Sequence, residues 1–172
     1  SEATLERDKP EAVILATGSV PLVPKIAGVE NSNVVGFADV LTGARKVGDR
    51  VIIIGGGMVG CETAEFLHAK GKQVTILEML PRVGDDIEVT NRMATLTRLR
   101  EAGIVMRANT KAVRITENGV EATSDGAAEF FEGDTVVLAA GAKPRDELAC
   151  DLEGKVAALY SVGDCVEPRL IR

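Results

Sequence analysis

Two hydrophobic periods alternate along the middle of the chain, and each change of period marks a change of predicted secondary structure. RVIII at residues 50–54 is a continuous β-branched run, which is typical of a parallel strand covered on both faces. From Met58 the apolar residues recur at helical spacing as far as Gly71, a residue suited to a helix C-terminus. QVTIL at residues 73–77 returns to a strand pattern. A strand, a helix and a second strand are therefore predicted in succession.

A second helical stripe follows between residues 89 and 99, and Asp85 and Asp86 precede it with charges that suit a helix N-terminus. The apolar members of this stripe are Val89, Met93, Leu96 and Leu99. GIVMRA at residues 103–108 is predicted as a third strand. The order β-α-β-α-β indicates an α/β fold, a Rossmann-like, doubly wound parallel sheet with flanking helices.

Asn118-Gly119 separates two strand-like runs, KAVRIT at residues 111–116 and VEATSD at residues 120–125. This dipeptide is a strong β-hairpin signal. The acidic run EFFEGD at residues 129–134 is interpreted as a solvated flank of that hairpin. A small antiparallel insertion is therefore expected between the Rossmann-like elements.

The ends of the chain carry shorter signals. AVILAT at residues 12–17 closes on Gly18 and predicts a buried strand, after which Pro21 and Pro24 favour an irregular, extended segment. The remaining predicted elements are a short helix at residues 38–43 and strands at residues 135–141 and 158–164.

Residues 55–60 read GGGMVG and match the pattern GxGxxG between a predicted strand and a predicted helix, which is the context this motif needs. Gly55 allows the tight turn, Gly57 lets the backbone approach a pyrophosphate, and Gly60 permits close packing of helix on strand. The unpaired N–H groups and the positive dipole end of the helix then favour phosphates. The segment predicts a dinucleotide site, and the alternative is a glycine turn followed by an unrelated solvated acid.

Glu78 ends the second strand, 23 residues after Gly55, close to the spacing expected of an acid that binds the adenosine ribose. A 2′-phosphate beside this carboxylate would bring two anions together, so NAD(H) is expected to be preferred over NADP(H). Arg82, four residues later, could cap the adenine or meet a 2′-phosphate. The alternative for Arg82 is a solvated loop cation.

The charge balance argues against nucleic acid as a partner. The chain of 172 residues has 26 acidic and 20 basic residues, a net charge of −6, and only five aromatic residues. No apolar stretch approaches the roughly 20 residues of a membrane span, so no membrane association is expected. The polar N-terminus SEATLERDKP is unlike a signal peptide.

The cysteines Cys61, Cys150 and Cys165 are odd in number and widely spaced, without a CxxC or a metal-ligand pattern. This usage favours a reducing cytoplasm, and no metal site is expected. Cys61 falls in the first helical turn, where the dipole could lower a thiol pKa, but a packing role is favoured. His68, the only histidine, shares a stripe with Cys61 and Glu65 opposite the apolar face, which favours a surface histidine over a catalytic one.

These motifs together resemble the flavin- and pyridine-nucleotide-dependent reductases over almost the whole chain. GGGMVGCETAEFL followed by VTILE is similar to their NAD(P)H domain, and AVILATGSVP resembles the segment that crosses between the FAD and NAD(P)H domains. TVVLAAGAKP resembles the return crossing, and LYSVGDC resembles the Gly-Asp motif that closes the FAD site. The resemblance implies FAD in the intact parent enzyme as well as a nicotinamide dinucleotide.

A narrower resemblance is to the C-terminal region of the 2,4-dienoyl-CoA and 2-enoate reductases, a family of NADH:flavin oxidoreductases. The segments that resemble this region are ADVLTG, GGGMVGCETAEFL, ILEMLPRVGDD and SVGDCVEPRLI. In that family a TIM barrel with FMN and an iron–sulfur cluster precedes this region. One alternative is a pyridine-nucleotide-disulfide reductase or NADH oxidase, which would need a redox cysteine pair. Another is a non-catalytic nucleotide-binding regulatory module.

The resemblance implies an NAD(P)H-binding module at residues 45–143 between FAD-domain segments at residues 1–44 and 144–172. Residues 1–54 contain no second GxGxxG, so the chain is expected to be a piece of a flavoenzyme and inactive alone. The resemblance also places Glu62 toward the nicotinamide and Asp164 at the FAD. The residues expected at cofactors are Gly18, Gly55, Gly56, Gly57, Met58, Val59, Gly60, Glu62, Glu78, Arg82, Gly141, Gly163 and Asp164. No residue is expected to act as acid, base or nucleophile.

Overall fold

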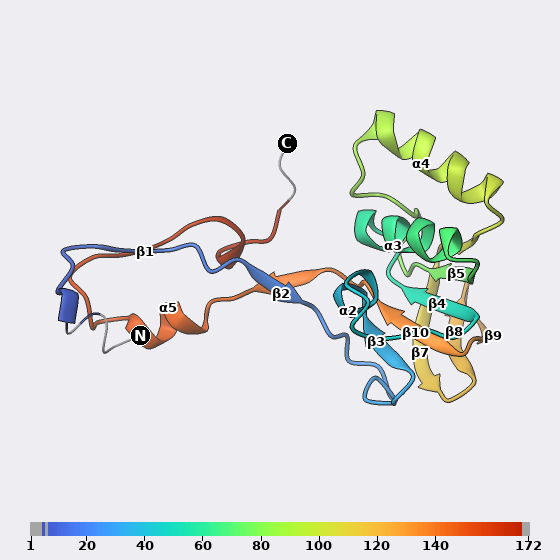
Figure 1. Cartoon of the computed structure of the whole chain (residues 1–172), viewed down its shortest axis with the longest axis horizontal. Helices are drawn as coiled ribbons and strands as arrows, with labels where there is room; N and C mark the ends of the chain where they lie inside the picture. The colour runs from blue at the N-terminus through green and yellow to red at the C-terminus, as the bar shows by residue number, and fades with distance from the viewer. Residues whose placement is uncertain (1–4, 6, 170–172) are drawn as a thin grey trace. The chain divides into compact units, whose positions relative to one another are not determined.

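The computed structural model describes residue 5 and residues 7–169 (Figure 1). The chain divides into two compact units. The larger is continuous and spans Val23–Gly141, and the smaller combines the described residues of Ser1–Leu22 and Ala142–Arg172.

A five-stranded parallel sheet forms the centre of the larger unit. Its order is β3 (Val34–Gly36), β10 (Thr135–Leu138), β4 (Arg50–Ile54), β5 (Gln73–Leu77) and β6 (Val105–Arg107). Every residue of β10 and all but the first of β4 are buried, as the continuous apolar runs predict. The predicted α/β fold with a parallel sheet is confirmed, and the predicted bounds of β4 and β5 are those observed.

One face of this sheet is covered by helices. The helices are α2 (Phe37–Leu41), α3 (Met58–Ala69) and α4 (Val89–Glu101), and α3 and α4 lie on the same side of the sheet in Figure 1. Val51 and Ile53 of β4 point into the core beneath them. None of the helices in the described part of the chain has the length and apolar content needed to cross a bilayer.

The other face of the sheet is covered by a second, antiparallel sheet. Its strands are β7 (Thr110–Thr116), β8 (Gly119–Ser124) and β9 (Ala127–Glu132), joined in that order. Ile52 and Ile54 of β4 pack into a core shared with β7 and β8, so alternate residues of one strand serve two different layers. Helices therefore cover one face and the hairpin insertion covers the other.

The hairpin predicted at Asn118-Gly119 is confirmed, and a third strand follows it. Asp125 and Gly126 both have positive φ, 47° and 87°, which suits the tight turn between β8 and β9. The segment interpreted as a solvated flank is mostly strand β9, in which Phe131 packs against the core and Phe130 is 49% exposed.

The apolar stripe predicted for α4 is only half right. Leu99 is fully buried and Leu96 partly so, but Val89 and Met93 are 65% and 62% exposed. The reason is that α4 meets the core through its C-terminal half alone. The acid at its N-terminus is Glu88, which accepts hydrogen bonds from the N–H groups of Thr90 and Asn91 at 2.9 and 3.3 Å.

The smaller unit is built from two-stranded ladders. Strand β1 (Val13–Leu15) pairs in parallel with β12 (Leu159–Ser161), and β2 (Ser19–Pro21) pairs antiparallel with β11 (Ala142–Pro144). The described part of this unit also contains α5 (Glu147–Leu152) and the 3-10 turn η1 (Gly163–Cys165). The prediction of a buried strand at β1 is wrong for Ile14, which is 68% exposed, because the described residues place no layer over its face of the two-stranded ladder.

Candidate functional site

The turn after β4 requires glycine for steric reasons. Gly55 has a φ of 108°, in the region that only glycine adopts readily. A Cβ there would lie 2.2 Å from the carbonyl oxygen of Ala139, and a Cβ on Gly60 would lie 2.0 Å from the carbonyl oxygen of Gly55. The roles predicted for these two glycines, a tight turn and close packing of the helix, match these contacts.

Gly57 makes room for a neighbour that the sequence did not indicate. A Cβ on Gly57 would lie 2.8 Å from Oδ2 of Asp86. The N–H of Met58, at the first position of α3, donates to Oδ1 of Asp86 at 2.8 Å. Asp86 was expected near the N-terminus of α4, and the structure shows that it caps α3 instead. The loop between β5 and α4 folds back over the glycine turn and carries this carboxylate with it.

The start of α3 keeps unpaired donors. The N–H of Cys61 bonds to the carbonyl of Gly57 at 2.9 Å, the first such bond at this end of the helix. Among the described residues, the N–H groups of Val59 and Gly60 have no hydrogen-bond acceptor. Unpaired N–H groups and the positive end of the helix dipole together form an environment that stabilises anions.

Glu78 is held in place by the backbone around it. The residue is only 8% exposed, directly after β5. One carboxylate oxygen accepts from the N–H of Gly56 at 2.6 Å, and the other accepts from the N–H of Leu80 at 2.7 Å. A carboxylate has about four lone-pair positions. Glu78 therefore ties β5 to the glycine turn and still has acceptor capacity for hydroxyl groups.

These groups border a cavity of about 660 Å³ within the larger unit, a volume in the range of small-molecule sites. Of the residues predicted to contact cofactors, the cavity is lined by Gly55, Gly56, Gly57, Val59, Glu78, Arg82 and Gly141. Met58, Gly60 and Glu62 lie in the first turns of α3 without lining it. The structure therefore brings most of the predicted nucleotide residues together at one hollow.

Arg82 is engaged elsewhere on its loop. Its Nε lies 2.9 Å from Oδ1 of Asp85, and Nη1 of Arg92 lies 3.5 Å from the same oxygen. The Arg82 side chain is 68% exposed. Its exposure matches the solvated loop cation considered from the sequence, although its pairing with Asp85 was not expected.

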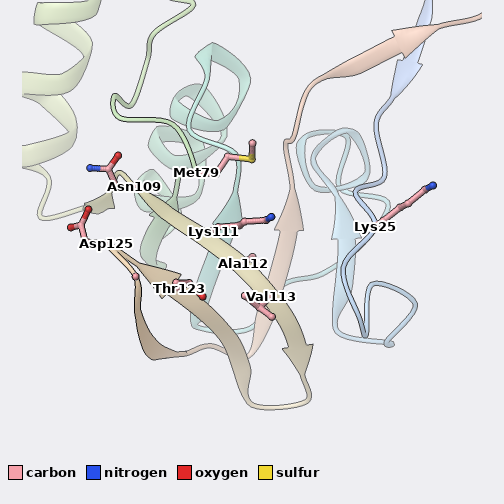
Figure 2. Close-up of a pocket in the computed structure, with 9 residues that line it drawn as sticks. Lys25, Met79, Asn109, Lys111, Ala112, Val113, Thr123 and Asp125 are labelled. Carbon is pink, nitrogen blue, oxygen red and sulfur yellow. The ribbon is translucent and has the colours of Figure 1, made fainter.

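Several lining residues were missed by sequence reasoning. Thr110, Lys111 and Ala112 come from the start of β7, and no local motif marks them. A second hollow of about 700 Å³ lies beside the cavity and shares its lining residues Lys25, Met79, Lys111 and Ala112. Figure 2 shows that its two lysines come from different segments, Lys111 from β7 and Lys25 from the chain that leads to β3.

The cysteine next to the glycine turn is a core residue. Cys61 is fully buried, and its thiol lies 3.6 Å from the carbonyl oxygen of Gly56. Burial, together with the charges of Asp86 and other nearby acids, raises the pKa of this thiol to about 12. The packing role is supported. The grouping of Cys61 on one exposed stripe with His68 was wrong, since His68 alone of the two is exposed.

The residues expected at FAD lie in the smaller unit. Gly18 and Gly163 have positive φ, 74° and 73°. Oδ2 of Asp164 lies 3.4 Å from the Ser19 hydroxyl, and the buried thiol of Cys165 donates to the carbonyl of Val162 at 3.1 Å. The three predicted residues thus occupy two turns of one unit, beside the ladder of β2 and β11.

Comparison with known proteins gives a consistent picture. A family model described as pyridine nucleotide-disulphide oxidoreductase matches residues 2–171. An NADH oxidase of Thermoanaerobacter brockii is 39% identical over 94% of this chain, and a metal reductase of Desulforamulus reducens is 31% identical over 98% of it. The structure of a 2-naphthoyl-CoA reductase with 2-naphthoyl-CoA matches 99% of this chain with a TM-score of 0.90 and 31% identity.

Each of these relatives is much longer than this chain. The matched region is 26% of the NADH oxidase, 30% of the metal reductase and 26% of the 2-naphthoyl-CoA reductase chain. The chain therefore spans about a quarter to a third of the length of the proteins it is similar to.

Proposed function

The chain belongs to the pyridine nucleotide-disulphide oxidoreductase family, and from that premise we propose that it binds NADH and orients its nicotinamide toward FAD in a longer flavoenzyme. The observation that carries the proposal is the shared cavity. The glycine turn, the unpaired donors of α3 and the buried Glu78 carboxylate all border or adjoin it. These are the three features that a dinucleotide requires of its site.

The pyrophosphate is assigned to the start of α3. The N–H groups of Val59 and Gly60 are available, and Gly55 and Gly57 line the cavity beside them. Such groups bind phosphates through hydrogen bonds and the helix dipole. Glu62, one turn farther along α3, is proposed to lie toward the nicotinamide.

The adenosine ribose is assigned to Glu78. Its carboxylate is fixed by two backbone N–H groups, and its remaining lone pairs can accept from the 2′- and 3′-hydroxyls. A 2′-phosphate would meet this buried negative charge, so NADH is favoured over NADPH. Gly141 and Arg82 line the same cavity and are proposed to lie at its rim, where the Arg82 side chain contributes little to NADH binding.

The FAD contacts are assigned to the smaller unit through Gly18, Gly163 and Asp164. The proposed division of the chain is an NAD(P)H-binding region, residues 45–143, between FAD-domain segments 1–44 and 144–172. Residues 23–44, which include β3 and α2, pack in the larger unit together with the NAD(P)H-binding region. When bound, FAD would supply the redox chemistry by accepting a hydride from the nicotinamide. The residues of this chain bind and orient the nucleotide, because proximity is a large part of such a transfer.

The parent enzyme is proposed to resemble 2,4-dienoyl-CoA and 2-enoate reductases, in which a TIM barrel with FMN and an iron–sulfur cluster accompanies this region. The 31% identity to a 2-naphthoyl-CoA reductase over nearly the whole chain supports a reductase of this general kind. The name of that protein describes an aromatic acyl-CoA substrate.

The proposal is tested by titrating the 172-residue chain with NADH and with NADPH, using calorimetry and nicotinamide fluorescence. Saturable binding of one NADH per chain, tighter than that of NADPH and competed by ADP-ribose, is the expected result. Binding of neither dinucleotide would contradict the proposed function. Equal or tighter binding of NADPH would contradict the role given to Glu78.

A further inference from the structure

The loop that follows β5 crosses back over the glycine turn, and we refer to residues 79–88 as the strap. It is anchored on the turn itself, where the N–H of Gly84 donates to the carbonyl of Gly56 at 2.6 Å. Asp85 in the strap is paired with Arg82 and Arg92, whose nitrogens lie 2.9 and 3.5 Å from its Oδ1. The strap therefore holds its next residue, Asp86, in a defined position.

Asp86 places a carboxylate where a ligand phosphate is expected. It lines the dinucleotide cavity, its Oδ1 accepts from the N–H of Met58 at 2.8 Å, and its Oδ2 lies over Gly57. The same N–H group and the same helix dipole would attract a phosphate. The protein thus supplies an anion of its own to the start of α3.

The other charges around this position are mixed. Glu78 and Asp85 add negative charge to the cavity lining, and Lys25, Lys111 and Arg82 add positive charge. Arg82 is paired with Asp85, so its charge is partly compensated. Asp86 itself has the N–H of Met58 as its hydrogen-bond donor, and the described residues place no cation in an ion pair with it. The charge of Asp86 is therefore not compensated by an ion pair beside the proposed phosphate position.

We propose that Asp86 competes with the cofactor's pyrophosphate and so sets the affinity of the site for phosphate-bearing ligands. This inference rests on the proposed dinucleotide function. The carboxylate occupies the Met58 N–H in the free chain, and a bound pyrophosphate must either displace it or remain close to its charge. The ligand then retains the unpaired N–H groups of Val59 and Gly60. Asp86 would act as a specificity-determining residue that leaves the adenosine contacts untouched.

The test compares the chain with its Asp86→Asn variant against three ligands: NADH, ADP-ribose and adenosine. Asparagine keeps an oxygen to accept from the Met58 N–H but has no charge. NADH and ADP-ribose are expected to bind about fivefold more tightly to the variant, while adenosine is unchanged. The gain should shrink at high ionic strength, because Asp86 is exposed and its charge is screened by salt.

Asp49→Asn is the matched control. Asp49 is 90% exposed, contacts Lys72, and precedes β4, at the end of that strand opposite the glycine turn. The Asp49→Asn substitution removes the same charge and should leave the affinities for NADH, ADP-ribose and adenosine unchanged. Asp86→Ala is the second variant, and it should lose helix stability as well as charge while binding adenosine normally.

The outcomes separate this inference from the proposed function. If NADH binds the unmodified chain but binds Asp86→Asn equally or more weakly, the role of Asp86 is wrong and the dinucleotide site stands. An equal gain for adenosine would also overturn it, because adenosine carries no phosphate. If no variant binds NADH or ADP-ribose, both the inference and the proposed function fail.

Discussion

The larger unit, Val23–Gly141, and the smaller unit, Ser1–Leu22 with Ala142–Arg172, cover their strands in different ways. Strand β4 has helices on one face and the β7–β8–β9 sheet on the other, so Val51–Ile54 are buried. Strand β1 is as apolar, VIL, but its two-stranded ladder leaves Ile14 exposed. The comparison teaches that an apolar strand is a core strand only where layers exist on both of its faces.

The same contrast extends to the candidate sites. In the larger unit, backbone donors, a buried carboxylate and a cavity lie together around the glycine turn. In the smaller unit, Gly18, Gly163 and Asp164 occupy turns beside a two-stranded ladder. The first arrangement brings a glycine turn, unpaired N–H groups and a carboxylate together within one unit, whereas the second has no glycine fingerprint of its own.

The largest expected difference is therefore in cofactor binding. The 172-residue chain should bind NADH, yet it should not retain FAD at one equivalent or oxidise NADH steadily. The reason is that residues 1–54 contain no second GxGxxG to present helix N–H groups to the FAD pyrophosphate. Absorbance spectra of the purified chain and NADH consumption with common acceptors check this. A yellow protein that carries one flavin per chain would contradict the predicted difference between NADH and FAD binding.

A pair of core substitutions sharpens the comparison of strands. Ile53→Ala in β4 removes a fully buried side chain and should lower the free energy of unfolding by about 2–5 kcal/mol. Ile14→Ala in β1 removes a side chain that is 68% exposed and should change it by no more than about 0.5 kcal/mol. Urea unfolding followed by circular dichroism measures both. Equal effects would show that the two strands are buried alike.

Glu78→Ser should affect both stability and cofactor preference. The N–H groups of Gly56 and Leu80 would lose their acceptor, which destabilises by about 1–3 kcal/mol. Loss of the carboxylate should also weaken NADH binding and narrow or reverse its preference over NADPH. Unfolding curves and parallel titrations with the two cofactors provide the measurements. Glu117→Ser, in the exposed turn between β7 and β8, is the control that should change neither.

Arg82→Ala should have the smallest effect. The guanidinium is 68% exposed and already paired with Asp85, so its removal should alter NADH affinity by less than about twofold. The affinity of the same variant for NADPH should be measured as well, since the positive charge of Arg82 could neutralise part of the charge of a 2′-phosphate. A tenfold loss of NADH affinity would assign Arg82 a direct contact with the cofactor.

The sequence by itself determined the elements whose signals are local. Strand β4, helix α3 and strand β5 follow directly from a β-branched run, a change of period and a terminal glycine. The turn at Gly55 and the hairpin at Gly119 were equally visible, because both need backbone conformations that few residues other than glycine adopt. Most of the predicted nucleotide residues also line one cavity, since the ends of neighbouring parallel strands meet at one edge of the sheet.

Only the tertiary structure decided which surfaces meet. The exposure of Val89 and Met93 on α4 depends on how far that helix lies over the core. The bond between Asp86 and the start of α3 depends on the path of the strap, and residue spacing assigned that acid to the wrong helix. Thr110 reaches the cavity from the insertion. Periodicity reports the state of a segment and the side that is apolar, but the partner of a surface is chosen by packing among segments distant in the chain.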